Sequence, residues 1–548
     1  VRGWIYDKSG YLLRELKRSD IQDVSPISDF TLYEDNRLKY CKPVADFYPY
    51  TVVYEYDIQY KGLFYYPTWQ AVPDFNVSVE KAAFTISSPT DLNFKYKQQR
   101  IPHKPVLKNN GKESIYLWNI QNIEALPEEP LSYDFSELVP AIYLAPAQFE
   151  IMGYAGNMKT WSDFGAWVSQ LNQGKDELTN KSAIKKVKEL KAEASEDIDL
   201  VQKIYEYMQS RTRYVNIKLG IGGYQPFEAD LVHEVGYGDC KALTIYTKAL
   251  LKKAGIQSYY TLVKAGESKL DIMLDFPSPQ FNHAFLCVPL QSDTVWLECT
   301  HQNIPFGYIS DFTHNRHVLL ITPDGGKIVK TPKYTANRNV QVQLTDVVID
   351  DKGSATLSVQ SNLKGLQYDF IREPVHQTAE NQKKWIYDNL ELPSFEILEF
   401  KFSEKRGFIP SGELNFRIGI DGFASKSNKR IFVPVNPLNK LEYAPNRQEN
   451  RKFDVVIHFP YTDYDTVTYQ LPDANYGTEY CPESQVIDSE FGYFEVAFQC
   501  DEENGTIQFT RHLIINDGIF SAEKFNQLAS FLSKVKEIDN SKMVFIRK

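Results

Sequence analysis

The stretch Gly236-Tyr-Gly-Asp-Cys-Lys-Ala-Leu-Thr-Ile-Tyr-Thr-Lys-Ala-Leu-Leu251 indicates the fold of the middle of the chain. Asp239 is a good N-cap and puts Cys240 at the first helical position. The helix is predicted over residues 241–253, because Gly255 suits a left-handed C-cap. Unpaired amides at a helix start favour an anion and lower the pKa of a thiol there. The stretch therefore predicts a reactive cysteine, and the alternative is that Cys240 packs as a small apolar residue.

Two segments downstream of this helix are typical of the strands of a hairpin. They are Gln280-Phe-Asn-His-Ala-Phe-Leu-Cys-Val-Pro289 and Val295-Trp-Leu-Glu-Cys-Thr300. With a turn centred on residues 290 and 291, His283 lies directly opposite Glu298. Opposed residues share a face of the sheet and lie within side-chain reach, so the pattern predicts contact between the imidazole and the carboxylate.

The order cysteine, histidine, acid suits nucleophilic catalysis. A thiolate needs a base, and the base needs an acceptor that orients it. Glu298 is expected to accept a hydrogen bond from one ring nitrogen of His283, which leaves the other nitrogen to face Cys240. The alternative is that His283 is a strand-end histidine with satisfied hydrogen bonds and that Glu298 is a solvated edge residue.

Three motifs carry a family resemblance. Gly238-Asp-Cys-Lys241, Asn282-His-Ala284 and Trp296-Leu-Glu-Cys-Thr300 together resemble the transglutaminase-like superfamily of papain-type cysteine enzymes. In that superfamily Cys, His and Asp occur in this order on a helix and adjacent strands. The run Arg213-Tyr-Val-Asn-Ile-Lys-Leu-Gly-Ile-Gly-Gly-Tyr-Gln-Pro226 is similar to the segment before the catalytic cysteine in one bacterial branch. The resemblance implies an α+β core in which the cysteine, histidine and acid of these motifs are catalytic.

The same resemblance extends to both ends of the chain. Members of the branch carry a β domain of unknown function in front and another β domain behind. Tyr6-Asp-Lys-Ser-Gly10 and Asp35-Asn-Arg-Leu-Lys39 resemble that front domain, which is expected to lack its first strands here. Many members are extracytoplasmic, so the resemblance implies a periplasmic, cell-surface or secreted protein. The chain starts at Val1, and either a targeting segment has been removed or this is an internal fragment.

One position departs from the family pattern. The third residue is usually Asp, in Trp-Leu-Asp-Pro-Thr, whereas Glu298 stands here and is followed by Cys299. Glutamate is one methylene longer and orients an imidazole if its strand sits slightly further back. Asp271 and Asp275 are fallback acids, but they lie on the wrong side of His283 in the expected order.

An oxyanion intermediate needs hydrogen-bond donors. The backbone amide of Cys240 at the helix start is the first expected donor. Gln225 is preferred as the second donor over Tyr224, because a neutral amide donates without a change of protonation. The alternative is that residues 220–226 form only a loop.

Length and composition bound the organisation. A chain of 548 residues exceeds one core, and the expected fold is multi-domain α+β with three units. These are a β-sandwich-like domain over 1–145, a transglutaminase-like core over 146–335, and a β-rich domain with a final helix over 336–548. Helices are expected over 160–173, 181–194, 197–211, 379–389 and 521–538, and strands over 51–60, 82–87, 114–119, 258–263, 340–349, 355–359 and 543–546.

Charge and cysteine usage exclude several classes. A net charge of −10 disfavours nucleic acid as a partner, and no apolar stretch reaches the roughly 18 residues that cross a bilayer. No Cys-x-x-Cys pair or Cys/His cluster occurs among the six cysteines, so no metal and no cofactor are expected. Cys481 and Cys500 are expected either to form a disulfide or to be two separate buried thiols.

The expected function is that of a cysteine hydrolase, a protease or amidase, acting on a peptide or protein substrate through a thioester. One alternative is an acyltransferase that passes the acyl group to an amine. The other is an inert scaffold whose β domains bind a glycan or peptide, which the aromatic content of 14% and the Glu298 substitution support. The oligomeric state is left open.

Overall fold

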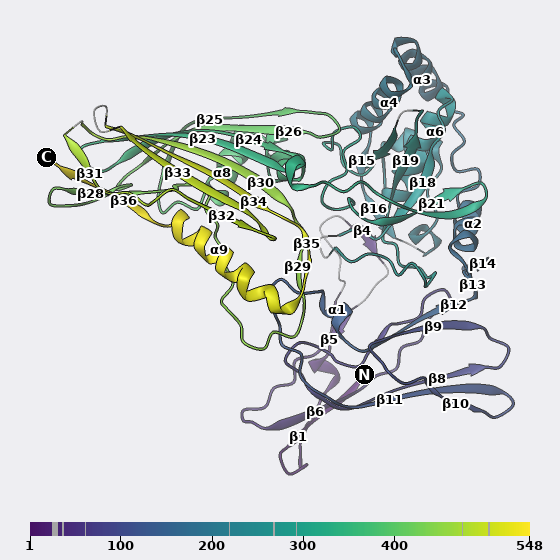
Figure 1. The fold of residues 1–548 in the computed structure, drawn as a ribbon. Helices are drawn as coiled ribbons and strands as arrows, with labels where there is room; N and C mark the ends of the chain where they lie inside the picture. The colour runs from purple at the N-terminus through teal and green to yellow at the C-terminus, as the bar shows by residue number, and fades with distance from the viewer. Residues whose placement is uncertain are drawn as a thin grey trace.

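The structure is a computed structural model, and it describes residues 1–24, 31–34, 38–60, 62–218, 220–266, 269–291, 293–473, 475–501 and 505–548. Of the segments quoted above, residues 35–37 and Leu219 lie outside the described residues. Sheets dominate both ends of the chain, and most helices gather around a five-stranded sheet in the middle (Figure 1). The architecture is multi-domain α+β, in agreement with the prediction.

The first sheet is formed near the N-terminus. Strand β1 (Arg2–Asp7) lies between β2 (Leu12–Glu15) and β6 (Tyr50–Glu55). The strand predicted over 51–60 stops at Glu55, so that prediction is too long. Its last paired residue is Glu55, opposite Arg2 at the start of β1.

Two further three-stranded sheets of the N-terminal part pack face to face. Their strands are β8 (Val79–Pro89), β10 (Val106–Asn109) and β11 (Glu113–Ile123) in one, and β7 (Trp69–Gln70), β9 (Phe94–Gln99) and β12 (Ala141–Pro146) in the other. Aromatic rings fill the space between them. Trp118 meets Tyr96 edge to face with centroids 5.2 Å apart, and Trp69 stacks on Phe84 at 5.2 Å. This packing fits the sandwich expected for this part of the chain.

The middle of the chain contains an antiparallel sheet with the strand order β20-β19-β18-β21-β22. The strands are β18 (Tyr259–Val263), β19 (His283–Pro289), β20 (Thr294–Leu297), β21 (His317–Thr322) and β22 (Gly325–Lys330). The helices are α2 (Trp161–Leu171), α3 (Lys181–Glu193), α4 (Asp197–Arg211), α5 (Ala229–Val235) and α6 (Cys240–Ala254). Four of these helices were predicted. The short α5 was missed, since seven residues show little periodicity.

Helix α6 is the central helix of this part. Most of its residues are buried, against α3, α4 and the sheet. Its start is fixed by Asp239, whose side chain accepts a hydrogen bond of 2.9 Å from the amide of Ala242. Its end is fixed by Gly255 in the left-handed region, with a φ of 88°. The capping residues read from the sequence therefore place Cys240 at the first helical position, as predicted.

The hairpin of β19 and β20 has a different register from the one expected. Leu286 pairs with Leu297 and Pro289 with Thr294, so the predicted turn centred on residues 290 and 291 is wrong. Continued by one residue, this ladder sets Glu298 opposite Phe285 rather than His283. The shift is two residues, and side chains alternate with a period of two, so His283 and Glu298 still share a face.

The C-terminal part is built on an eight-stranded sheet with the order β25-β26-β24-β23-β30-β34-β33-β32. Its strands are β23 (Val340–Ile349), β24 (Ala355–Lys364), β25 (Glu396–Lys405), β26 (Ser411–Ile420), β30 (Tyr461–Gln470), β32 (Gln485–Ser489), β33 (Gly492–Asp501) and β34 (Thr506–Ile515). Helix α9 (Phe525–Asp539) lies along this sheet (Figure 1), and α8 (Ala379–Asn389) and β36 (Lys542–Arg547) follow their predicted ranges. The predicted start at residue 521 is too early for α9, because residues 522–524 form a 3₁₀ turn.

Cys481 and Cys500 are close together but not bridged. Their Sγ atoms lie 3.8 Å apart, with Cys500 exposed. The expectation of two separate buried thiols is therefore wrong, and the disulfide is not formed in this structure. Strand β33 brings Cys500 alongside the segment that contains Cys481, which accounts for the proximity.

Polar contacts join residues 129–131 to residues 451–453. Glu129 accepts hydrogen bonds from the amides of Lys452 and Phe453, at 2.8 and 3.0 Å. Arg451 donates to the carbonyls of Pro130 and Leu131. The N-terminal and C-terminal parts are therefore in direct contact.

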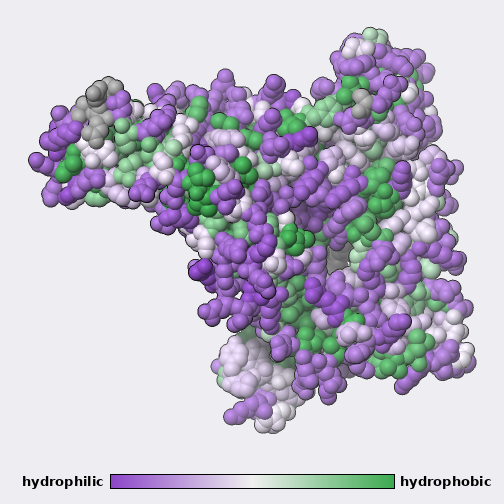
Figure 2. Space-filling model, in the orientation of Figure 1, coloured by the Kyte–Doolittle hydropathy of each residue, from purple (hydrophilic) through white to green (hydrophobic). Residues whose placement is uncertain are grey.

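One face of the molecule is mostly polar. Figure 2 shows a face on which hydrophilic residues dominate and hydrophobic residues lie in small separate groups. Among the described residues, no helix combines the length and the apolar character needed to cross a membrane.

Candidate active site

Cys240 lies at the wall of a cavity of 500 Å³ in the middle part of the chain. The cavity is also lined by His283 at the start of β19 and by residues of α2 and β18. Cys240 itself is partly exposed, whereas the thiols of Cys287 and Cys299 are buried in the core. Cys240 is therefore the thiol that a molecule in this cavity can reach.

The structure brings His283 and Glu298 together. Nε2 of His283 is 2.9 Å from Oε2 and 3.0 Å from Oε1 of the carboxylate. His283 is 9% exposed and Glu298 2% exposed, so the contact is shielded from water. The remaining ring nitrogen, Nδ1, is left for an interaction with the thiol of Cys240, which lines the same cavity. Glu298 is thus not a solvated edge residue.

The electrostatics of these three groups favour a thiolate and an imidazolium. Burial raises the pKa of Cys240, but the hydrogen bond with His283 and the charge of Lys241 outweigh burial and hold this pKa below its ordinary value. Burial lowers the pKa of His283, but the charge of Glu298 and the hydrogen bond with Cys240 raise it to about 10. Burial raises the pKa of Glu298, and the charge and hydrogen bond of His283 lower it overall.

Glu298 is held by Thr300 on its own segment and by Tyr205 on α4. The hydroxyl of Thr300 donates to Oε1 at 2.7 Å, and the amide of Thr300 donates to the same oxygen at 3.2 Å. The hydroxyl of Tyr205 on α4 donates to the backbone carbonyl of Glu298 at 2.8 Å. These contacts fix the longer side chain, so the glutamate is positioned to orient an imidazole. Thr300 belongs to the motif that predicted the site, but its role was not foreseen.

A buried ion pair stands beside the cysteine. The ammonium of Lys241 contacts the carboxylate of Asp239, and both side chains are almost fully buried. Burial lowers the pKa of Lys241, but the charges of Asp239 and Cys240 raise it overall, so this ammonium stays protonated. Lys241 therefore adds a fixed positive charge next to the thiol.

The predicted side-chain donor for an oxyanion points elsewhere. The amide nitrogen of Gln225 donates to the hydroxyl of Tyr154 and to the carbonyl of Leu171, each at 3.3 Å. Tyr224, the second choice, does line the cavity. Gln225 is not part of the cavity lining, because the loop turns its amide toward α2.

Two upstream residues that the sequence analysis missed line the cavity instead, Tyr214 and Asn216. Burial and the charge of Cys240 raise the pKa of Tyr214 far above its ordinary value, so its hydroxyl keeps its proton and remains a donor. The backbone amide of Cys240 has no acceptor within α6, because it is the first residue of the helix. The Cys240 amide and the Tyr214 hydroxyl are the candidate donors.

The fallback acids are committed to other partners. Asp271 accepts a hydrogen bond of 2.6 Å from Nδ1 of His317. Asp275 pairs with Lys97 and is largely exposed. Neither replaces Glu298. Within the ranges that the structure describes, no group of three or more His, Cys, Asp or Glu side chains is arranged to hold a metal ion.

Comparisons with known proteins fit this layout. The family model of a domain of unknown function with a solved structure, DUF3857, matches residues 1–127, and that of another such domain, DUF3858, matches residues 429–545. These matches lie in front of and behind the middle part, where β domains were expected. A search of curated proteins found no match.

Two solved structures are similar to this chain. A putative protease from Parabacteroides distasonis aligns over 100% of this chain and 88% of its own, with 13% identity and a TM-score of 0.56. A putative cysteine protease from Cytophaga hutchinsonii aligns over 42% of this chain and 73% of its own, with 10% identity and a TM-score of 0.16. The first likeness shows that the chain shares the overall fold of the Parabacteroides protein.

Proposed function

We propose that this chain is a cysteine hydrolase that cleaves a peptide or side-chain amide bond through a thioester on Cys240. The observation that carries the proposal is a buried histidine, paired with a carboxylate, that shares the wall of a cavity with a partly exposed thiol. The fold shared with a putative protease supports it. The extracytoplasmic location remains a prediction.

The first half of the reaction forms the thioester. The Cys240 thiolate attacks the amide carbonyl carbon, and the carbonyl oxygen takes the negative charge. The Cys240 amide at the start of α6 and the hydroxyl of Tyr214, which lines the cavity, are the donors to that oxygen in this proposal. The His283 imidazolium then gives its proton to the leaving nitrogen, the C–N bond breaks, and the amine departs.

The second half restores the enzyme. Neutral His283 takes a proton from a water molecule, whose oxygen attacks the thioester carbon. The C–S bond breaks, a carboxylic acid is released, and the thiolate and imidazolium pair forms again. Glu298 keeps Nε2 of His283 protonated through both halves and stabilises the charged ring.

Labelling with iodoacetamide tests the proposal. Cys240 is expected to alkylate at pH 6 at least about tenfold faster than Cys500, which is exposed and has no histidine among its described contacts. Peptide mapping by mass spectrometry assigns each label. His283→Ala should bring the Cys240 rate down to the Cys500 rate. Equal rates at the two thiols in the parent protein would contradict an activated Cys240.

Turnover is tested separately with a mixture of peptides. Peptides are expected to be cleaved by the parent protein and left intact by Cys240→Ala, and hydroxylamine should trap the acyl group as a hydroxamate. Transfer of the acyl group to an added amine, with no carboxylate product, would replace the hydrolase by the acyltransferase. An alkylatable Cys240 without any acyl-enzyme would favour the inert scaffold.

A further inference from the structure

One side of the cavity beside Cys240 is apolar. Its wall contains the aromatic side chains of Phe164 and Trp167 from α2 and of Phe281, together with Val168 and Leu262. They belong to one hydrophobic cluster, against which Cys240 also packs. Its volume of 500 Å³ lies within the roughly 300–1,000 Å³ of pockets that enclose small ligands.

The charged groups of this wall are already committed. Among the described residues, the charged or ionisable side chains at the wall other than tyrosines are Cys240, His283 and Lys241. His283 is paired with Glu298 and Lys241 with Asp239, and Cys240 interacts electrostatically with both cations. A charged side chain that entered the apolar part would lose its hydration and find no free partner of opposite charge, which is costly. An apolar side chain would gain from burial.

One wall residue comes from the N-terminal part of the chain. Phe64 follows β6 in sequence, is 3% exposed, and lines the cavity. Its ring lies 5.3 Å from that of Trp167 and 4.9 Å from that of Tyr224, centroid to centroid. The N-terminal part therefore supplies part of the wall next to the nucleophile.

We propose that this cavity binds a large apolar side chain, aromatic or aliphatic, of a peptide substrate next to the bond that Cys240 attacks, and that Phe64 is a specificity-determining residue. This inference rests on the proposed function and names its substrate class. It also gives the N-terminal part a role in choosing the substrate.

The test uses short peptidyl aldehydes that differ only in the side chain adjacent to the aldehyde: Phe, Leu, Gly, Asp or Lys. An aldehyde adds reversibly to a thiolate, so inhibition of iodoacetamide labelling of Cys240 reports binding. The Phe and Leu compounds are expected to protect Cys240 at concentrations at least about tenfold lower than the Asp and Lys compounds, because their side chains gain from burial.

Variants then test the role of Phe64. Phe64→Ala should reduce the preference for Phe over Gly at least about threefold. Phe149→Ala is the matched control, because Phe149 is equally buried and packs on Phe64 at 4.9 Å but does not line the cavity. This control should keep the parent preference. Met152 lines the cavity and is 62% exposed, so Met152→Lys can be used even if Phe64→Ala does not fold. It should shift the preference toward the Asp compound.

The outcomes separate this inference from the proposed function. Equal protection by all five aldehydes, or a preference for Gly, Asp or Lys, would overturn the apolar pocket and leave an activated Cys240 intact. An equal change of preference in Phe64→Ala and Phe149→Ala would remove the special role of Phe64. A Cys240 that iodoacetamide does not label faster than Cys500 would overturn the proposed function and this inference together.

Discussion

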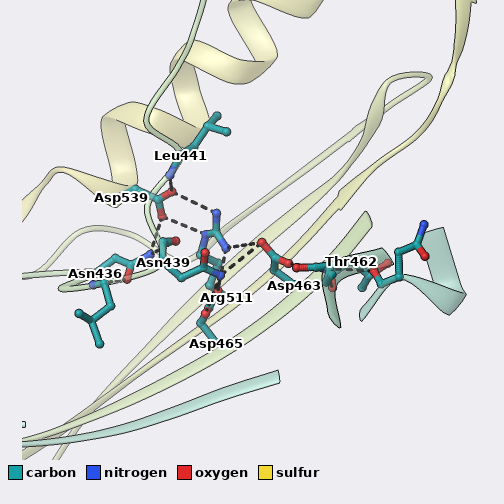
Figure 3. Close-up of polar contacts among 11 residues, drawn as sticks. Asn436, Asn439, Leu441, Thr462, Asp463, Asp465, Arg511 and Asp539 are labelled. Atoms are coloured by element: carbon teal, nitrogen blue, oxygen red, sulfur yellow. Dashed lines mark hydrogen bonds and ion pairs between the residues drawn. The ribbon is translucent and has the colours of Figure 1, made fainter. Parts of the chain in front are cut away.

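Two parts of this molecule bury ionised groups, and they use them differently. The middle part has Cys240, His283 and Glu298. The C-terminal part has Arg511 on β34, which pairs with Asp465 at 2.7 Å and with Asp539 of α9 at 3.0 Å. Figure 3 shows Asp463, Asp465 and Asp539 around this arginine. All four of these side chains are at most 8% exposed.

The difference lies in what completes each cluster. Around Arg511, protein groups supply the remaining hydrogen bonds: Asn439 donates to Asp465 at 3.0 Å, and the Leu441 amide donates to Asp539 at 2.9 Å (Figure 3). The cysteine site instead opens onto a cavity and holds a nucleophile. Burial of charge is therefore a poor sign of catalysis by itself, whereas buried charge beside a reachable thiol is a good one.

Cys240→Ala should give the largest effect of any change in either cluster. Removal of the nucleophile is expected to lower amide hydrolysis by at least about a thousandfold. The free energy of unfolding should change by less than about 1 kcal/mol, because one partly exposed sulfur is lost. Turnover and urea denaturation measure the two quantities. If Cys240→Ala turned over substrate as fast as the parent protein, the Cys240 cluster would not be catalytic.

Arg511→Met should have the opposite effect to Cys240→Ala. It should lower the free energy of unfolding strongly and change the reactivity of Cys240 little. Three buried carboxylates would lose their cation, at a cost of about 3–5 kcal/mol in the free energy of unfolding. The rate of Cys240 alkylation per folded molecule should stay the same.

Arg417→Met is the control for Arg511→Met. Arg417 pairs with Glu399 on the same sheet but is 48% exposed, so its loss should cost less than about 1 kcal/mol. Similar losses in the two variants would show that the Arg511 cluster adds nothing beyond a surface ion pair.

The comparison also explains what the sequence could predict. Capping residues and periodicity are local, so the bounds of α4, α8 and β23 and the place of Cys240 on α6 could be predicted. The contact of His283 with Glu298 was predicted from a register that is off by two residues. The predicted contact is still present because a shift of two residues keeps each side chain on the same face of the sheet.

Other features depend on tertiary packing and could not be predicted. Gln225 lies in a loop whose direction is set by Tyr154 and Leu171, far away in sequence. Phe64 reaches the cavity only because the N-terminal part docks there. The cluster around Arg511 joins β30, β34 and α9, and the sequence carries no local sign of it.

At the cysteine site, Glu298→Gln should have the next largest effect on activity after Cys240→Ala. A neutral amide cannot stabilise the imidazolium, so amide hydrolysis is expected to fall by about a hundredfold or more. The charge of Glu298 helps to raise the pKa of His283, so the alkaline limit of activity should also move to lower pH. The pH profile of kcat/KM measures both.

Glu298→Asp tests the length of this side chain. It restores the charge and the residue usual in the resembling family, so it should recover most of the activity lost in Glu298→Gln. A Glu298→Gln variant with an unchanged pH profile would mean that Glu298 does not act on His283.

Asp465→Asn should give the smallest effect, and one that depends on pH. Burial is the main cause that raises the pKa of Asp465 to about 7 in the folded protein. The charge of Asp463 also raises this pKa, and the charge of Arg511 lowers it. The other ionisable groups at this cluster are Asp539 and the Tyr461 hydroxyl. In the unfolded chain an aspartate titrates near about 3.9. Between these values the folded state holds a proton that the unfolded state has released, so this group contributes stability at low pH that is lost as the pH rises toward 7. Relative to Asp465→Asn, the free energy of unfolding of the parent protein should therefore fall by about 1 kcal/mol or more between pH 5 and pH 8.

Hydrogen exchange of the β30 and β34 amides measures this local stability. The control is Asp346→Asn on β23, because Asp346 is exposed, and this variant should follow the parent protein. The difference in the free energy of unfolding between the parent protein and Asp465→Asn could instead stay constant with pH. The carboxylates of the cluster would then be fully ionised, and the two sites would differ only in that the cysteine site opens onto a cavity.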